Sequence, residues 1–284
     1  NGTVALEIAL KALAVGPGDE VIVTPRSFIA SVSCVVNVGA KPVFADVDLN
    51  SGNISPRSIK RLINKKTKAI ICVHLAGFPC QMDEIINLSL KNNLYIIEDC
   101  AQAHGAKYKG KPVGSIGHIG CWSFCNDKIM TTGGEGGMIA TNDENIWRKV
   151  WSIKDHGKSI KSVYESKHRP GFRWLHDSFG SNFRMTEMQA AIGRIQLKKV
   201  EEWRIRRSEN ANAIIDVFKK YDSLIRIPKV EDIFDHAWYK LYVYVKTNGL
   251  GKNWNRDRII AEINELSIPC YSGSCPEIYL EKAF

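Results

Sequence analysis

The first half of the chain alternates between strand patterns and helix patterns, and this alternation limits the folds open to it. Short strand-like runs, such as those at 19–25, 68–75 and 94–103, are separated by segments with apolar residues at helical period. Strands that are apolar along nearly their whole length are typical of a sheet covered by helices on both faces. The sequence therefore predicts an α/β fold with a mostly parallel sheet between helices and right-handed crossovers.

The pattern changes beyond the middle of the chain. Two closely spaced strand-like runs, 121–125 and 137–141, precede an expected helix over 143–157. A polar, aromatic-containing loop is expected over 158–183, and residues 185–221 predict one long helix or two in series. These elements extend the α/β pattern to the end of the long helix.

The last part of the chain predicts a second, smaller unit. Residues 237–246 alternate like a half-exposed strand, and residues 255–268 have the spacing of an amphipathic helix. We therefore predict a large domain over 1–205 and a smaller, incomplete α+β domain over 206–284. The chain opens at the start of a helix and stops within an element, so both ends look cut from something longer.

Charge and hydropathy argue against two classes of partner. The formal net charge of +9 suits an anionic partner, but eight Lys or Arg over 194–220 are interspersed with four Asp or Glu. No basic block carries the interleaved aromatics that stack on bases, so no nucleic-acid partner is expected. No apolar run approaches the roughly 18 residues of a membrane span, so no membrane partner is expected either.

The eight cysteines do not indicate a metal site. None forms a C-x-x-C pair, and no histidine spacing nearby completes a zinc site, so no metal is expected. Several cysteines lie in apolar stretches and fit as small core residues. This usage is typical of a reducing compartment such as the cytoplasm.

Residues able to bind a charged ligand fall at a helix start and a strand end, where open α/β sheets bind ligands. Gly2 and Thr3 open a helix, whose free N–H groups and dipole favour a phosphate. Asp99 and Gln102 follow the apolar residues of the run 94–103, toward its C-terminal end. A carboxylate at the end of a buried strand costs free energy unless a cation or hydrogen-bond donor meets it.

One lysine, Lys128, stands five residues after Ser123 and just before the glycine-rich turn 133–137. A Walker A loop is excluded because the lysine precedes the glycines, and no dinucleotide fingerprint follows a strand. A phosphate site, a carboxylate, a lysine and a tight turn together meet the needs of pyridoxal 5′-phosphate. Its aldehyde forms a Schiff base with a lysine, and its ring nitrogen binds an acidic partner.

Several longer stretches closely resemble the nucleotide-sugar aminotransferases of the DegT/DnrJ/StrS type. In chain order they are NGTVALEIALKAL, GPGDEVIVTPRSFIAS, GAKPVFADVD, IIEDCAQAHGAKYKGKPVGSIG, SFCNDKIMTTGGEGG and FGSNFRMTEMQAAIGRIQL. The resemblance covers residues 1 to about 205 and continues more loosely to the end. It implies the aspartate-aminotransferase fold (fold type I), usually as a homodimer whose active sites are built by both subunits.

The resemblance also implies roles for individual residues. Lys128 matches the Schiff-base lysine, and Asp99 matches the acid that pairs with the ring nitrogen. His156 and Arg184 lie in matching segments and are candidate substrate contacts, although a capping role suits His156 equally well. The other cofactor-binding positions are Gly2, Thr3 and Ser123 at the phosphate, Phe28 on the ring face, Gln102 beside the phenolic oxygen, and Asn182 reaching the phosphate from the partner subunit.

Two further residues in these stretches have no cofactor role in this interpretation. For His104 we expect a structural hydrogen-bonding role, and Glu135 has no assigned role. The choice of sugar is expected to lie in the 158–181 loop and the C-terminal region. Residues 272–279 suit the nucleotide end of a substrate or a plain turn equally well.

The activity implied by the resemblance is transfer of an amino group from glutamate to a nucleotide-linked keto-sugar. The product would serve a surface polysaccharide, a lipopolysaccharide or a glycosylated metabolite. One branch of the family has histidine in place of the lysine and removes a hydroxyl, and Lys128 argues against that sugar dehydration. The alternatives left open are a same-fold enzyme with another substrate, such as aromatisation of an amino-cyclohexenone, and a non-catalytic sensor that binds pyridoxal phosphate.

Overall fold

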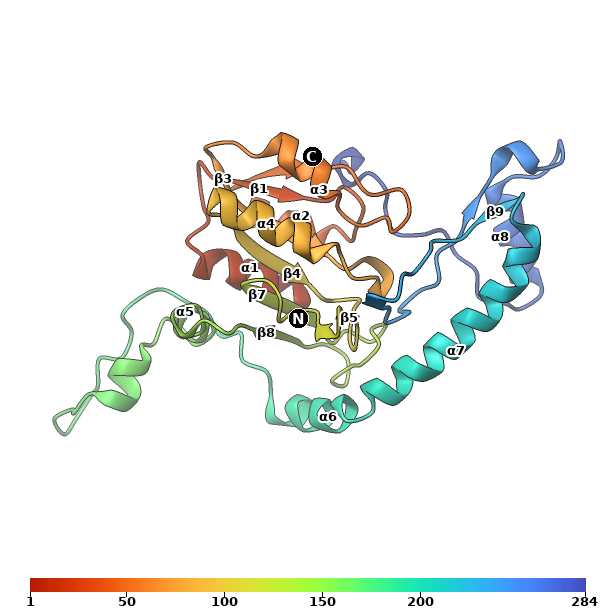
Figure 1. Cartoon of the computed structure of the whole chain (residues 1–284). Coiled ribbons are helices and arrows are strands. Elements are labelled where there is room, and N and C mark those ends of the chain that lie inside the picture. The colour runs from red at the N-terminus through yellow and green to blue at the C-terminus, as the bar shows by residue number, and fades with distance from the viewer.

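A six-stranded sheet forms the centre of the structure, a computed structural model that describes residues 1–284 (Figure 1). The strand order is β2-β1-β3-β4-β7-β8, and all neighbouring pairs are parallel except β7 with β8. The predicted α/β fold with a mostly parallel sheet is confirmed. The strands are β1 (Glu20–Val23), β2 (Lys41–Phe44), β3 (Thr67–Val73), β4 (Tyr95–Asp99), β7 (Ile119–Ser123) and β8 (Gly137–Ala140).

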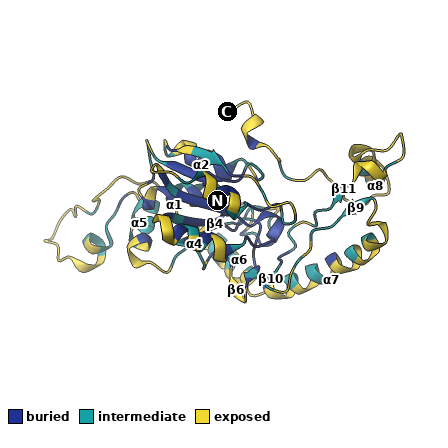
Figure 2. Ribbon diagram, turned by 45° about the horizontal axis from the view of Figure 1, so that its top comes forward, coloured by how far each residue is buried: buried dark blue, intermediate teal, exposed yellow.

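Helices cover both faces of the sheet because alternate strand residues bury their side chains on opposite sides. On one face, Val21 and Ile71 share a core with α1 (Gly2–Ala12), α2 (Ala30–Asn37) and α5 (Glu144–Lys154). On the other face, Ile22 and Ile70 pack with α3 (Pro56–Leu62) and α4 (Met82–Asn92). Figure 2 shows this buried body in dark blue between exposed outer segments.

Local chemistry accounts for several helix boundaries. The Asn1 side chain accepts a hydrogen bond from the N–H of Val4 and so caps α1, while Asp143 caps α5 in the same way. Pro56 occupies the first position of α3, where a missing N–H has no cost. Helix α4 ends at Asn93, whose φ of 53° is left-handed.

The predicted long helix is two helices in series, α6 (Glu187–Leu197) and α7 (Val200–Phe218). Thr186 begins α6 with a capping box, in which its side chain and that of Gln189 each accept a hydrogen bond from the other residue's backbone N–H. Residues 158–183, here called the arm, precede α6 and contain one π-helical turn, Lys161–Glu165. The arm projects from the molecule beside α5, on the side opposite α7 and α8 (Figure 1).

The C-terminal part returns to the sheet body. Strand β10 (Phe234–Asp235) pairs with β5 (Lys107–Tyr108), which also pairs with β6 (Lys111–Pro112). Ile278 is fully buried in the core that contains α1, and its N–H donates to the Pro25 carbonyl over 3.0 Å. The remaining elements are β9 (Ile225–Arg226), β11 (Tyr244–Val245), helix α8 (Arg256–Glu265), and short helical turns at Leu75–Gly77, Lys219–Tyr221, Thr247–Gly249 and Ile278–Leu280. The division into domains at 205 and 206 falls within α7 and stays a prediction.

The strand predicted over 237–246 is wrong for most of its length, because only Tyr244–Val245 is a strand. The N–H groups of Ala237 and Tyr239 donate instead to the carbonyls of Gly77 and Ala76, in the turn after β3. The alternation therefore reflects docking of this segment onto the large body. The predicted helix over 255–268 is confirmed as α8.

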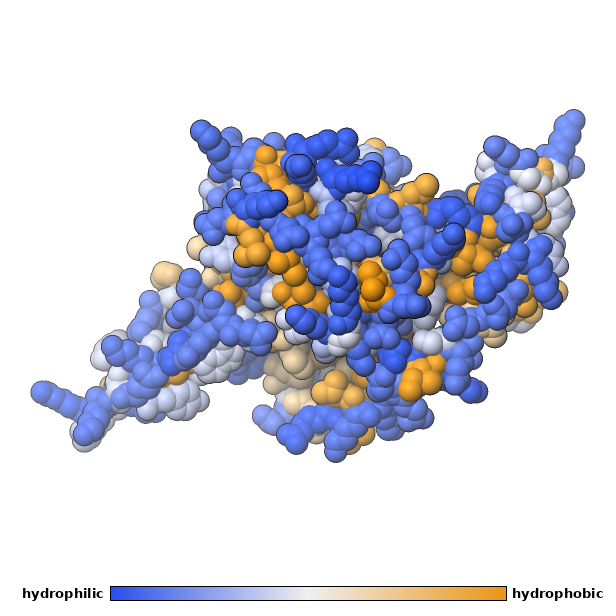
Figure 3. Space-filling model, in the orientation of Figure 1, coloured by the Kyte–Doolittle hydropathy of each residue, from blue (hydrophilic) through white to orange (hydrophobic).

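The surface of the molecule is largely polar on the face drawn in Figure 3, where hydrophobic patches lie over the central body and near α7. None of the helices combines the length and the apolar character that crossing a membrane requires.

Candidate active site

Asp99 ends β4 as a buried carboxylate, 5% exposed. Its Oδ2 accepts a hydrogen bond from Ser31 Oγ over 2.7 Å, and its Oδ1 accepts one from the N–H of Ala101 over 3.1 Å. No cation lies within ion-pair distance of it. Burial raises the pKa of Asp99, and the two hydrogen bonds only partly oppose that rise.

The buried Asp99 carboxylate lacks a positively charged partner. Removing a carboxylate from water costs several kcal/mol, a cost that two hydrogen bonds offset only in part. The protonated ring nitrogen of pyridoxal phosphate is a cation that a carboxylate can hold. The surroundings of Asp99 therefore fit that cofactor.

Lys128 lies in the loop after β7, with its side chain 16% exposed. Its Nζ lies 3.3 Å from Asp127 Oδ2 and 3.5 Å from the Tyr239 hydroxyl, which itself donates to Asp127. Burial opposes ionisation of Asp127, but Tyr239 and Lys128 outweigh it and hold the pKa of Asp127 below its usual value. Burial raises the pKa of Tyr239, so its hydroxyl is a neutral donor. The lysine is thus held between an anion and a tyrosine that sequence reasoning missed.

The start of α1 meets the end of β7. A Cβ on Gly2 would lie 2.8 Å from Ser123 Cβ, so only glycine permits this approach. The first-turn N–H groups of Gly2 and Thr3 have no acceptor within the helix. Gly137, in the glycine-rich turn, lies against the same helix start. A Cβ on it would lie 2.5 Å from the Asn1 carbonyl oxygen, so this position requires glycine. The structure therefore brings the predicted phosphate ligands together.

Gln102 and Phe28 lie in the loops after β4 and β1. Gln102 is 8% exposed, and its Oε1 accepts a hydrogen bond from the N–H of Ala76 over 2.7 Å. Phe28 is 66% exposed, which leaves its ring open to a ligand. Both loops leave the carboxyl ends of parallel strands, the edge at which Asp99 stands.

Asn182, His156 and Arg184 lie elsewhere in the chain. They gather around Asp155: it pairs with Asn182 in an isolated β-bridge and forms an ion pair with Arg184, while the N–H of the adjacent His156 donates to the Ser181 carbonyl. Asp155 and His156 directly follow α5, and Asn182 and Arg184 directly precede α6. Within one chain none of the three forms a hydrogen bond or an ion pair with Asp99 or Lys128.

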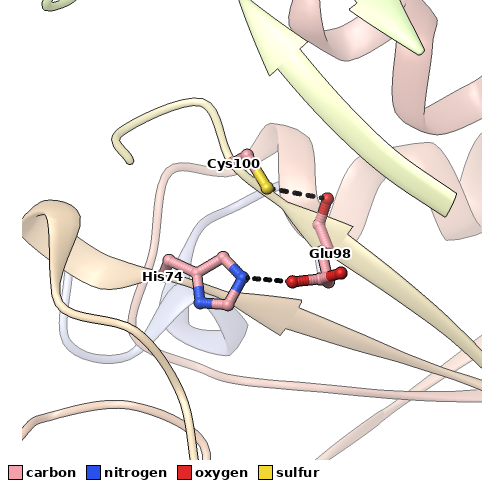
Figure 4. A group of neighbouring side chains, drawn as sticks. All are labelled: His74, Glu98 and Cys100. Atoms are coloured by element: carbon pink, nitrogen blue, oxygen red, sulfur yellow. Dashed lines mark hydrogen bonds and ion pairs between the residues drawn. The ribbon is translucent and has the colours of Figure 1, made fainter. Parts of the chain in front are cut away.

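A buried cluster behind Asp99 supports the strand end (Figure 4). Burial opposes ionisation of Glu98, but His74 and the backbone donors outweigh it and lower its pKa. His74 has no free nitrogen, because its Nδ1 accepts from the N–H of Cys80 over 3.0 Å. Although Cys100 lies near enough for the three to surround an ion, the ligand atoms of His74 and Glu98 are already engaged. The Glu98 carboxylate accepts four hydrogen bonds, from His74 Nε2 and the N–H groups of Gly114, Ile116 and Gly117.

The hydrogen-bonding role predicted for His104 is wrong. Its ring is 3% exposed and lies 5.2 Å from the Trp122 ring and 5.7 Å from the Phe124 ring, centroid to centroid. Neither ring nitrogen has a hydrogen-bond partner, although the Ser123 backbone lies close enough to favour the charged ring. Aromatic packing holds this residue, and burial lowers its pKa to about 4.

The chain also matches known proteins over nearly its whole length. The model of the DegT/DnrJ/EryC1/StrS aminotransferase family matches residues 1–272. The chain belongs to this family. The fold and the family expected from the sequence motifs are thereby confirmed.

Three relatives illustrate the range of the family. GDP-perosamine synthase of Escherichia coli O157:H7 is 42% identical over 249 residues, 87% of this chain and 64% of that protein. The dTDP-3-amino-3,6-dideoxy-alpha-D-galactopyranose transaminase of Aneurinibacillus thermoaerophilus is 35% identical over 100% of this chain and 74% of its own length. A solved aminotransferase from Psychrobacter cryohalolentis is 62% identical, with a TM-score of 0.98, over 100% of this chain and 74% of that one. The chain thus spans about two thirds to three quarters of these relatives' length.

We expect His104 to make stability depend on pH. Its folded pKa of about 4 lies below the unfolded value of 6.5, so the unfolded chain binds the proton first as the pH falls. Stability is therefore lost between pH 6.5 and 4, by about 2 kcal/mol at pH 5. In His104→Phe, the difference in free energy of unfolding between pH 7.5 and pH 5 should shrink by about that amount, measured by urea titration.

The control is His176→Phe, which removes an exposed imidazole of the arm. A pH difference in His104→Phe as large as that of the unsubstituted protein would contradict the assignment of a neutral, buried ring.

Proposed function

We propose that the protein is a pyridoxal-phosphate-dependent aminotransferase that moves an amino group from glutamate to a nucleotide-linked keto-sugar. The observation that carries this proposal is the buried Asp99 carboxylate without a cation, in a site that also contains Lys128. The names of the relatives, which include a GDP-perosamine synthase and a dTDP-amino-sugar transaminase, support the class of substrate.

Each residue of the site has a stated task in this proposal. Bound pyridoxal phosphate supplies an electron sink for the carbon that gains or loses the amine. Asp99 keeps the proton on the ring nitrogen, since an adjacent anion favours the charged form. Lys128 holds the cofactor covalently and carries the proton to and from the substrate carbon. Gly2, Thr3 and Ser123 bind the phosphate, Gln102 lies beside the phenolic oxygen, and Phe28 packs on the ring.

We also propose the cellular compartment of the reaction and the use of its product. We place it in the cytoplasm, since all eight cysteines are free thiols, as expected in a reducing compartment. The amino sugar produced would enter a surface polysaccharide, a lipopolysaccharide or a glycosylated metabolite.

We further propose that the enzyme acts as a homodimer whose active sites are shared. Within one chain the Asn182 side chain accepts a hydrogen bond from the N–H of Arg184 and bonds neither Asp99 nor Lys128, so its phosphate contact would come from the partner subunit. Soluble monomers rarely expose so many large apolar side chains in one region. Exposed residues of this kind on the arm and α6 are Phe172, Trp174, Phe179, Met188, Ile195 and Leu197.

Substitution of Lys128 tests the proposed activity. Lys128→Ala should lose the cofactor attachment that borohydride makes permanent, as read by intact-protein mass. Conversion of glutamate to 2-oxoglutarate with a nucleotide keto-sugar should fall by about 10²–10⁴-fold or more, the share that a positioned acid–base group supplies.

Lys65→Ala, which removes an exposed lysine that forms no ion pair, is the matched control. The proposal fails if Lys128→Ala retains the attachment and the turnover of the control.

The shared site predicts complementation between two inactive variants. Lys128→Ala and Asn182→Asp should each be inactive alone, the second because it places an anion beside the phosphate. After subunit exchange, mixed dimers would contain one intact site, and about a quarter of all sites should work. A mixture no more active than its separate components, or an active Asn182→Asp protein, contradicts the shared site.

A further inference from the structure

Two arginines share one tyrosine beside the loop that carries Phe28. Arg26 belongs to this loop, and its guanidinium carbon lies 5.4 Å from the ring centroid of Tyr242 and 5.1 Å from that of Tyr244. Arg226 faces Tyr244 across the β9–β11 pair, with its guanidinium carbon 3.9 Å from the same centroid. Segments about 200 residues apart thus place two cations around one aromatic ring.

Neither guanidinium has a carboxylate within ion-pair distance. Nη1 of Arg26 donates to the Tyr244 hydroxyl over 2.6 Å, but its buried Nε has no hydrogen-bond partner. Nη1 of Arg226 donates to the Leu49 carbonyl over 2.9 Å. A guanidinium has five N–H donors, and a buried donor without an acceptor costs free energy. The pair therefore has donors and positive charge to offer to an anion.

Two glycines, Gly52 and Gly273, lie close to the Arg26 guanidinium. A Cβ on Gly52 would lie 2.7 Å from Arg26 Nη1, so a larger residue would displace the guanidinium. A Cβ on Gly273 would lie 3.9 Å from Arg26 Nη2, an ordinary contact distance. The next residue, Ser274, bonds the Tyr242 hydroxyl through its Oγ over 2.7 Å. The segment 272–279 therefore borders this cluster.

A short chain of contacts joins the arginine loop to the candidate active site. Ser27 Oγ lies 2.8 Å from Ser31 Oγ, which donates to Asp99 over 2.7 Å. Arg26 is thus adjacent in sequence to a residue that leads to Asp99 and is two residues from Phe28. A substrate whose sugar lies against the cofactor would direct its remaining groups toward the rim formed by this loop.

We propose that Arg26 and Arg226 bind the diphosphate of the nucleotide-linked sugar and so select an anionic substrate. The substrate identity rests on the proposed function, whereas the anion site rests on the two arginines themselves. Guanidinium groups bind phosphate oxygens with paired N–H donors, and this match is better than any lysine provides. Tyr244 contacts both guanidinium groups and Tyr242 contacts that of Arg26, and these contacts position the two cations.

The test is a calorimetric titration of the holoenzyme with GDP, dTDP, UDP and inorganic pyrophosphate. The unsubstituted protein should bind at least one nucleotide, more weakly as salt is raised. Arg26→Met and Arg226→Met should each raise the Kd of that nucleotide at least about tenfold, the effect of losing one charge-assisted hydrogen bond. Arg61→Met is the matched control, because Arg61 is an exposed arginine on α3 that packs on neither Tyr242 nor Tyr244.

Several outcomes overturn the proposal. One is that no nucleotide binds the unsubstituted protein, or that pyrophosphate alone binds. Another is that both variants bind as tightly as the control while their thermal midpoints fall, which would make the cluster a purely structural tie. A third is that Arg26→Met slows reaction with glutamate while nucleotide affinity is unchanged, which would assign the arginine to the donor's carboxylate. If Arg26→Met does not fold, Arg226→Met alone decides by the same criteria.

Measuring nucleotide affinity and amino transfer separately distinguishes a failure of the anion site from a failure of the proposed function. Nucleotide affinity that depends on both arginines in a protein that transfers no amine keeps the anion site and refutes the aminotransferase. Amino transfer to a keto-sugar with the same KM in both variants keeps the enzyme and refutes the site.

Discussion

Asp99 ends the central strand β4 as a buried carboxylate that no cation of the chain neutralises, and the candidate site is arranged around it. Ser31, on α2, supplies its strongest hydrogen bond, at 2.7 Å. Next to it, Glu98 accepts hydrogen bonds from His74 and from the N–H groups of the turn before β7, and these bonds tie the end of β4 to its neighbours. The fold therefore holds an anion in a place where it is costly, which is what a site for a cationic ring requires.

The segment 26–31, which runs from the loop after β1 into α2, links the proposed anion site to the candidate active site. Arg26 contacts Tyr244 in the proposed anion site, and the ring of Phe28 is exposed. Ser31, at the other end of this segment, donates a hydrogen bond to Asp99. The C-terminal segment is pinned to this loop by the hydrogen bond from Ile278 to Pro25. A contact that fixes the loop thus affects cofactor and substrate together.

Sequence reasoning found the elements and residues whose signals are local. The strands were recognisable because both faces are buried, and Asp99 and Lys128 because their motifs are contiguous. Tyr239 and Arg26 were missed because their partners come from segments more than 100 residues away. His104 was assigned a hydrogen bond because its polarity is visible in the sequence, whereas the aromatic walls that replace that bond are not. Residues 237–246 have the alternating sequence pattern of a strand, but their backbone donors bond the turn after β3, a partner that the local sequence does not reveal.

The most direct test of this account compares the thermal midpoint of Asp99→Asn with that of the unsubstituted protein, with and without pyridoxal phosphate. Without the cofactor, the neutral amide should raise the midpoint, because burial raises the pKa of Asp99 and its charge is a cost at neutral pH. With the cofactor, the variant should gain less stability than the unsubstituted protein, because the cationic ring has lost its anion. A variant that melts lower without the cofactor, and gains as much from it, would contradict the account.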